Sequence, residues 1–398
     1  MSVPAPPGPP APGPTGIGLT PLDVASGMVL GPDDGVAALS PAPGAPAARA
    51  ALEAVILDAL RRPPCLVSFS GGRDSSALLA TAASVARREG LPLPVPATVV
   101  FPDLQDTSES SWQEQVLTHL ELPDWVRLQV HDELDTLGPV AREVLTRHGL
   151  LFPCNAHLQV PVLDAAAGGS VVTGVGGDEL FTPSEWSRAA RVLWGRHRLP
   201  RPRDLAWVAV AGAPRPLRRR FAGRRLGLSV PWLRPEPERL VVGQAARWLS
   251  AQPVRFDRVV RRWWWRCRYL QLGLRSFRLL GAARDVSVLH PFADPGVLTA
   301  MAAQAGAAGF GGRTEAMRAL FGDLLPPAVV DRPTKAVFDG VLLNRYSMEF
   351  AQSWRGDGVD SSLVDPERLR RSWLEGPFDI RTLPAMQAAW LSTRAARA

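Results

Sequence analysis

The sequence contains almost no lysine. Lys335 is the only one among 45 lysine and arginine residues, so arginine supplies nearly all of the positive charge, and the net charge is +7. The chain also holds 39 prolines and many alanines, which together with the arginines indicates a compositional bias. A high isoelectric point that arises in this way is weak support for nucleic-acid binding.

Cysteine is scarce, and long apolar runs are missing. Cys65, Cys154 and Cys267 form no CxxC pair, which argues against a zinc or iron–sulfur site and fits a reducing cytoplasm. We expect them to be small buried residues. No apolar run reaches the ~18 residues of a membrane helix, and the N-terminus lacks the charged and apolar regions of a signal peptide. We therefore expect a soluble cytoplasmic protein without membrane contact.

The length and composition predict a folded protein that begins with a disordered tail. The 398 residues allow two or three domains, and 46% hydrophobic residues are ample for a core. Residues 1–17 are rich in proline and show no periodicity, which predicts a disordered tail. We expect this tail and its lead-in to extend to residue 45.

Residues 65–76, CLVSFSGGRDSS, have the pattern of a strand that turns through two glycines into a helix. Residues 66–69 predict a buried parallel strand, and residues 77–88 predict the helix that follows. This turn suits phosphate, because Gly71 and Gly72 let the backbone approach a ligand and the helix start offers N–H groups. Ser70, Ser75 and Ser76 add hydroxyl donors.

Asp74 changes the interpretation of this turn. Its carboxylate would repel phosphate unless a cation lies between them, so the turn predicts Mg²⁺ beside a nucleotide. The alternative is a plain strand-to-helix turn in which Asp74 and Ser75 only cap the helix. The strand–turn–helix context favours the nucleotide.

The turn resembles the SGGxDS loop of the N-type ATP pyrophosphatases, which split ATP into AMP and pyrophosphate. Residues 170–181, SVVTGVGGDELF, resemble the second signature of the asparagine synthetase family, which includes β-lactam synthetases and lasso-peptide cyclases. Both motifs follow apolar strands, so both should lie at the carboxyl edge of one parallel sheet. The resemblance implies that Asp74 and Asp178 share Mg²⁺ and that Gly174 and Gly176 contact ATP.

The resemblance also implies an α/β fold, in which a twisted parallel sheet carries helices on both faces and is followed by a helical C-terminal part. Two further strands are expected at 97–101 and 126–130, and helices at 47–60, 108–122 and 133–147. In the family, the edge of the second strand contacts adenine. Val100 and Phe101 are therefore either base contacts or ordinary core residues.

An arginine-rich insertion interrupts the family layout. We expect the ATP pyrophosphatase core at residues 46–187, the insertion at 188–260 and the helical part of the synthetase domain at 261–398. Residues 188–225 contain twelve arginines and one acid, Asp204. This stretch is either a solvated basic loop or a docking surface for an acidic partner such as a carrier protein, a peptide or RNA.

The C-terminal third restores the resemblance. Residues 288–294, VLHPFAD, resemble an R-x-PF-L-D element that packs against the active site. Residues 324–338, LLPPAVVDRPTKAVF, resemble the LP-x-x-I-x-x-R-x-K-x-x-F segment of the family. The lysine of that segment stabilises charge on the acyl-adenylate and pyrophosphate, which implies that Lys335 is catalytic.

Val175 departs from the family pattern, which has glutamate or tyrosine at this position. Valine neither takes a proton nor donates a hydrogen bond, so the amine must lose its proton to another group. His157 and Glu179 are the candidates. A hydrogen-bonded structural role is the alternative for His157.

These motifs predict an ATP-dependent ligase that activates a small-molecule or peptide carboxylate as an acyl-adenylate and passes it to an amine or ammonia. Fewer than seventy residues precede the ATP loop, so we expect no glutaminase domain and no use of glutamine. Two alternatives stay open. One is a degenerate synthetase fold that only binds nucleotide or a partner; the other is an RNA-modifying pyrophosphatase, which fits the arginines but not GVGGDELF.

Overall fold

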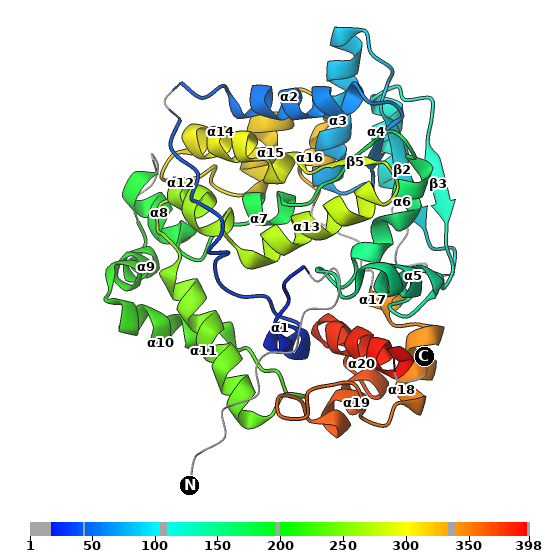
Figure 1. Ribbon diagram of the computed structural model, residues 1–398. Helices are drawn as coiled ribbons and strands as arrows, with labels where there is room; N and C mark the ends of the chain where they lie inside the picture. The colour runs from blue at the N-terminus through cyan, green and yellow to red at the C-terminus, as the bar shows by residue number, and fades with distance from the viewer. Residues whose placement is uncertain (1–16, 43, 104–109, 196–199, 333–338, 396–398) are drawn as a thin grey trace.

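The structure, a computed structural model, describes residues 17–42, 44–103, 110–195, 200–332 and 339–395. A five-stranded sheet forms its centre (Figure 1). The strands lie in the order β3-β2-β1-β4-β5, and every neighbouring pair is parallel. They are β1 (Cys65–Ser68), β2 (Val95–Val100), β3 (Val126–Gln129), β4 (Ser170–Val172) and β5 (Ser287–Leu289). The predicted α/β class is confirmed.

Alternate residues of the central strands face opposite sides of the sheet, and helices cover both sides. Val67 and Val172 belong to one buried cluster, whereas Leu66 and Val171 belong to another. Because both faces of the central strands are covered, β1 and β4 are mainly apolar, whereas the edge strand β3 alternates between half-buried and exposed residues. The sheet is therefore wound on both faces, as the resemblance implied.

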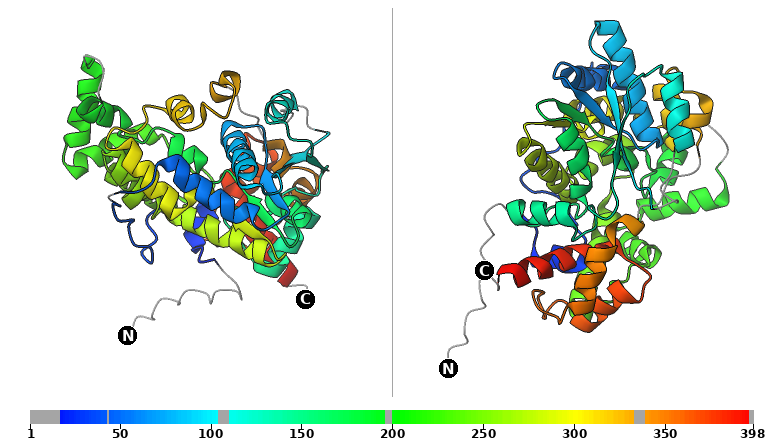
Figure 2. Two further views of the ribbon diagram at one scale, coloured as in Figure 1. Left: turned by 90° about the horizontal axis from the view of Figure 1, so that it is seen from above. Right: turned by 90° about the vertical axis from the view of Figure 1, so that its right-hand side faces the viewer.

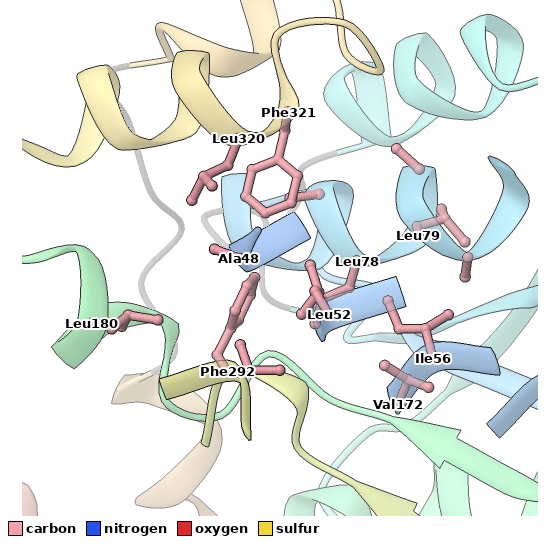
Figure 3. Packing of buried hydrophobic residues seen from close by; sticks show 14 of the residues in the cluster. Ala48, Leu52, Ile56, Leu78, Leu79, Val172, Leu180, Phe292, Leu320 and Phe321 are labelled. Carbon is pink, nitrogen blue, oxygen red and sulfur yellow. The ribbon is translucent and has the colours of Figure 1, made fainter. Parts of the chain in front are cut away.

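The first face carries the largest buried cluster (Figure 3). There Phe292 and Phe321 approach one another edge to face, with ring centres 6.3 Å apart, beside Leu52 and Leu78. The helices that contribute to this cluster are α2 (Ala48–Leu60), α3 (Arg73–Glu89), α4 (Ser110–His119), α14 (Pro295–Ala305), α15 (Arg313–Phe321) and α16 (Pro327–Val330). A short 3-10 turn, Pro291–Ala293, carries Phe292.

The second face is covered by α5 (Pro139–His148), α6 (Val160–Ala165) and α13 (Arg268–Ala282). A 3-10 turn, Ala156–Gln159, leads into α6. The helix expected at 133–147 begins only at Pro139. Its first residues are held in a turn instead, because the buried Asp135 carboxylate accepts a hydrogen bond from the Leu137 N–H group, at 2.7 Å.

The arginine-rich segment is helical. It contains α8 (Ser187–Trp194), α9 (Pro202–Gly212), α10 (Arg215–Leu226), α11 (Pro235–Ala251) and α12 (Phe256–Arg258), followed by a π-helical stretch, Val259–Trp264. Trp186 is fully buried among Trp207 and Phe221, so α8, α9 and α10 share a small apolar core of their own. Figure 2 shows these green helices projecting to one side of the sheet domain.

The C-terminal helices form a group below the sheet domain together with the start of the chain (Figures 1 and 2). They are α1 (Pro21–Ser26), α17 (Asp339–Leu342), α18 (Arg345–Ser353), α19 (Pro366–Leu374) and α20 (Leu383–Ala395), with a 3-10 turn at Ile380–Thr382. Ile17 and Val29 are buried, so the lead-in from residue 17 is packed rather than disordered. None of the helices in the described part of the chain has the length and apolar character that crossing a bilayer requires.

Candidate active site

The two glycine motifs meet at the point where the strand order reverses. β1 and β4 are neighbours, whereas β2 and β3 lie beyond β1 and β5 lies beyond β4. The loops after β1 and β4 therefore leave the sheet side by side, in the position where α/β sheets bind ligands. Two glycines allow close contact: a side chain at Gly177 would meet the Asp74 carboxylate at 2.6 Å, and one at Gly174 would meet the Asp74 Cβ at 3.6 Å.

The first loop is shaped by its own serines. Gly71 has a φ of +80°, which favours glycine, and Gly72 is the N-terminal cap of α3. The Ser75 hydroxyl donates to the Gly72 carbonyl oxygen at 3.0 Å and accepts from the Ser70 N–H group at 3.3 Å. Within the described residues no side chain caps α3, so its first N–H groups are available to phosphate oxygen atoms. α3 begins four residues earlier than expected, which puts Asp74, Ser75 and Ser76 into its first turn.

Asp74 and Asp178 converge on one guanidinium group. Arg313, the first residue of α15, pairs through Nη2 with Asp74 and through Nη1 with Asp178, at 2.7 Å for the latter. Burial acts to lower the pKa of Arg313, but the two carboxylates together raise this pKa above its ordinary value. The residues expected to share a metal ion are thus brought together around a cation.

The same two carboxylates suit Mg²⁺. This ion binds in proteins through one or two carboxylates and completes its ligands with phosphate oxygen atoms and water. In the described part of the chain no three His, Cys, Asp or Glu residues gather into a complete protein metal site. Asp74 and Asp178 therefore fit an ion held jointly with a triphosphate, rather than a metal held by protein alone.

Two further arginines surround the first loop. Arg332, which follows α16, is 4% exposed and donates from Nη1 to the Gly71 carbonyl oxygen at 2.9 Å. Arg73 donates to the Thr314 hydroxyl at 3.2 Å, and burial, followed by the charge of Arg313, lowers the pKa of Arg73. Three guanidinium groups therefore lie around a loop that presents N–H groups, an arrangement that favours a polyanion.

His290 stands beside the second motif. It directly follows β5, and its Nδ1 lies 2.6 Å from the Thr173 hydroxyl oxygen, which also accepts from the Val175 N–H group at 3.4 Å. Burial, and then the charge of Arg278, lower the pKa of His290 to about 4. This half-buried imidazole is therefore neutral near pH 7, next to the position where valine replaces a polar residue.

Three further residues were predicted from the sequence to belong to the site: His157, Phe101 and Val100. His157 is 2% exposed, and its Nε2 lies 3.0 Å from the Leu134 carbonyl oxygen. Burial also lowers the pKa of His157, and its contact with the Leu134 carbonyl oxygen favours the structural alternative; its role as a base stays a prediction. Phe101 packs with Val130 and Leu134, which favours the core alternative for it. Val100, at the end of β2, is half-buried.

Glu179 and Lys335 are the two remaining residues that the sequence predicted to be catalytic. Glu179 lies on α7 (Gly177–Phe181) and is exposed. The pKa of Tyr269 is raised by burial first, then by the neighbouring Cys267 and then by the negative charge of Glu179. The Glu179 carboxylate therefore disfavours ionisation of the Tyr269 phenol, which lies beside the second motif. Lys335 lies outside the described residues.

The sequence argument missed Arg313. Residues 309–313, GFGGR, precede α15 just as the first glycine pair precedes α3, and Gly309 and Gly311 have φ angles of +78° and +98°. A third glycine turn that runs into a helix was the available signal. Residues 288–294, which the resemblance places against the active site, contain His290, but the position of its imidazole beside Thr173 depends on the pairing of β5 with β4.

A model of the asparagine synthase family matches residues 48–391. No curated protein matches the chain. The matched region runs from α2 into α20 and includes both glycine motifs, the insertion helices and Arg313.

Proposed function

Because the chain belongs to the asparagine synthase family of ATP-dependent amide-forming synthetases, we propose that it joins a carboxylate to an amine and releases AMP and pyrophosphate. The observation that carries the proposal is the convergence of Asp74 and Asp178 on one cation between two glycine loops. Paired carboxylates at a phosphate loop suit a metal–triphosphate complex and do not suit bare phosphate.

In the proposed complex the triphosphate lies along the loop of residues 70–76 and over the start of α3. Mg²⁺ held by Asp74 and Asp178 would supply charge neutralisation and orientation of the phosphates. Arg313 is then released from the carboxylates, and its charge faces the phosphates together with those of Arg73 and Arg332. Val100 remains the candidate contact for the adenine base.

The reaction has two steps. A carboxylate oxygen atom attacks the α-phosphorus of ATP, and the bond from that phosphorus to the bridging oxygen of pyrophosphate breaks. The amine nitrogen then attacks the acyl carbon, the bond to the AMP oxygen breaks, and the nitrogen loses a proton. Positive side chains stabilise the leaving pyrophosphate, and Lys335 is proposed as the group that follows this charge.

We assign the proton acceptance to His290. A pKa of about 4 keeps this imidazole unprotonated at pH 7 but also makes it a weaker base than an ordinary histidine, so the assignment rests on its position. Its contact with Thr173 fixes the ring beside Val175, where the family has a polar side chain. Glu179 is the second candidate, because it is exposed on the same motif.

We propose that the acyl donor is a small-molecule or peptide carboxylate and that a free amine or ammonia, rather than glutamine, supplies nitrogen. The cytoplasm, which supplies ATP, is the proposed location.

Binding without catalysis is the second candidate function, and Val175 is the observation that favours it. A protein of this kind would bind ATP with Mg²⁺ but would not exchange pyrophosphate into ATP. The intact pair of carboxylates and the ordered loop around Gly71 favour the enzyme instead.

Exchange of labelled pyrophosphate into ATP, screened over candidate carboxylates, tests the proposal. We expect exchange with at least one carboxylate, AMP as the nucleotide product, and no benefit from glutamine over free amine. The Asp178→Asn variant is the matched control, because it keeps the side-chain shape but loses the charge. ADP as product, or magnesium-dependent ATP binding without exchange for any carboxylate, would contradict the ligase.

A further inference from the structure

A basic groove of about 810 Å³ runs between α10 and α11, which lie side by side (Figure 1). Arg215, Arg219 and Arg220 line it from α10, and Arg247 lines it from α11. All four side chains are exposed, and no acidic residue lines the groove. Four guanidinium groups around one concave surface produce a strongly positive local potential.

None of these four arginines has an ion-pair partner among the described residues, whereas many other arginines of the chain do. Elsewhere the groups are matched, as in Arg318 with Asp331 at 2.7 Å or Arg284 with Asp164 at 2.6 Å. Near the insertion, Asp204 lies 4.0 Å from Arg188 and Glu185 lies 3.7 Å from Arg225, and the two acids at the start of α11, Glu236 and Glu238, do not line the groove. The positive charge of the groove is therefore uncompensated within the described residues.

The floor of the groove is apolar. Pro216, Val242 and Ala246 line it beneath the arginines. Gly243 also belongs to the floor, and the Arg219 guanidinium lies above it, 3.5 Å from where a Cβ atom would be. At the rim Leu240 is 50% exposed and precedes Gly243 and Arg247 by three and seven residues, which puts it on the same face of α11. The surface thus offers apolar contacts inside a ring of positive charge.

Hydrogen bonds connect the helices of the groove to the candidate active site. Arg218, next to Arg219 on α10, donates to the Gln252 carbonyl oxygen at 2.8 Å. The Gln252 side chain accepts from the Glu185 N–H group at 2.7 Å, four residues after the second motif helix ends. Arg191 on α8 donates to the Gly311 carbonyl oxygen at 3.0 Å, two residues before Arg313. A molecule bound in the groove would therefore lie on a helix that is joined through Gln252 to the segment after the second motif.

We propose that the α10–α11 groove docks an acidic polypeptide segment that carries apolar side chains, such as an amphipathic helix rich in glutamate. The glutamates pair with the arginines, and the apolar side chains contact Val242, Ala246 and Leu240. A nucleic acid fits less well, because its phosphates need no apolar floor and no aromatic side chain lines the groove for bases to stack on. The inference concerns binding alone and does not depend on the proposed reaction.

Fluorescence anisotropy with a labelled synthetic peptide of glutamate and leucine in helical spacing tests the docking, without ATP. Two other probes accompany it: the same peptide with glutamine in place of leucine, and a single-stranded RNA of similar charge. We expect saturable binding of the first peptide, several-fold weaker binding of the second, and loss of binding as salt rises.

Two triple variants of equal net charge locate the binding. Arg219→Gln, Arg220→Gln and Arg247→Gln together should weaken the peptide about tenfold, because three exposed charge pairs are lost. The control changes three exposed arginines that already have acidic partners, Arg61→Gln, Arg368→Gln and Arg371→Gln, and should stay within about twofold. Circular dichroism verifies that both variants are folded.

Three outcomes overturn the proposal. If the peptide shows no saturable binding at low salt, the groove is not a docking site. If both triple variants lose peptide binding equally, the binding reflects the net charge of the protein and not the groove. RNA that binds more tightly than the peptide and is lost in the groove variant would make the surface a nucleic-acid site. Pyrophosphate exchange by the groove variant, measured separately, stays near that of the unchanged protein whichever result is found.

Discussion

The Arg332 guanidinium donates a hydrogen bond to the carbonyl oxygen of Gly71, although the two residues are 261 positions apart in the sequence. The same side chain lies 5.0 Å from the ring centre of Trp112 on α4, so it is clamped between a loop and a helix. Arg332 is therefore fixed at the proposed phosphate site. Lys335, three positions later in the sequence, lies outside the described residues, and its catalytic role stays a prediction.

Lys335→Arg should keep ATP affinity within a few-fold but slow single-turnover formation of AMP on the order of a hundredfold. The ammonium is compact and can follow charge from the α-phosphate to the leaving pyrophosphate, whereas the guanidinium is planar and larger. Lys335→Ala should be at least as slow. Arg371→Lys, the reverse change at an exposed site, is the control and should react normally. A wild-type rate for Lys335→Arg would exclude the lysine as the charge stabiliser.

Asp74→Asn and Asp178→Asn should each weaken magnesium-dependent ATP binding by about tenfold or more, because each removes one carboxylate ligand of the ion. Calorimetry with and without Mg²⁺ measures the effect. The affinity for ATP without Mg²⁺ should change less, because it depends on the loop N–H groups and the arginines. If the unchanged protein binds ATP equally well with and without Mg²⁺, the assignment of the metal to this site is wrong.

Arg313→Gln should destabilise the metal-free protein by about 2 kcal/mol, because it leaves two neighbouring carboxylates without a cation. Added Mg²⁺ should therefore raise the melting temperature of the variant more than that of the unchanged protein. Thermal unfolding with a titration of Mg²⁺ tests this without any turnover. If Mg²⁺ shifts both proteins equally, Arg313 does not occupy the place of the ion.

The fold could be predicted because its signals are local. The apolar runs at 65–69 and 170–172 and the glycines after them indicate strands, turns and parallel order without any distant contact. Element ends were less accurate, because distant groups set them. The start of α5 is an example: buried Asp135 also accepts from the Ser347 N–H group of α18, at 3.1 Å, and so holds a turn where helix was expected.

The candidate site was only half predictable. Asp74 and Asp178 belong to motifs that can be identified from the sequence alone. Arg313, in contrast, is 239 positions from Asp74 and 135 positions from Asp178, and it is one arginine among many. His157 is another example, since a histidine near a sheet edge suggested chemistry, whereas its burial and its contact with the Leu134 carbonyl oxygen favour a structural role. Sequence pattern does not show which side chains tertiary contacts already satisfy.

The protein should lose stability as pH falls below about 6.5, the pKa of an unfolded histidine. In the folded state burial holds the pKa of His290 at about 4, so the unfolded chain binds more protons between these values and folding weakens. Burial lowers the pKa values of His157 and His148 in the same sense. His290 alone accounts for about 2 kcal/mol between pH 7.5 and pH 5. Urea unfolding at both pH values checks this, and His290→Asn should show a smaller loss than the unchanged protein.

His290→Asn should separate the two steps of the proposed reaction. Asparagine has an amide close to the position of Nδ1, so it can keep the hydrogen bond to Thr173, but it cannot accept a proton from the amine. Pyrophosphate exchange, which reports the first step, should stay within about threefold, whereas amide formation should fall roughly a hundredfold, the usual scale of a general base. His157→Asn is the matched control, because it removes a buried histidine that contacts the Leu134 carbonyl oxygen and should lower stability without changing the ratio of the two steps. The rise of amide formation as pH passes about 4, the pKa of His290, should also disappear in His290→Asn if this imidazole is the base. Equal loss of both steps would make His290 a structural residue, and an unchanged rate of amide formation would move the role to Glu179.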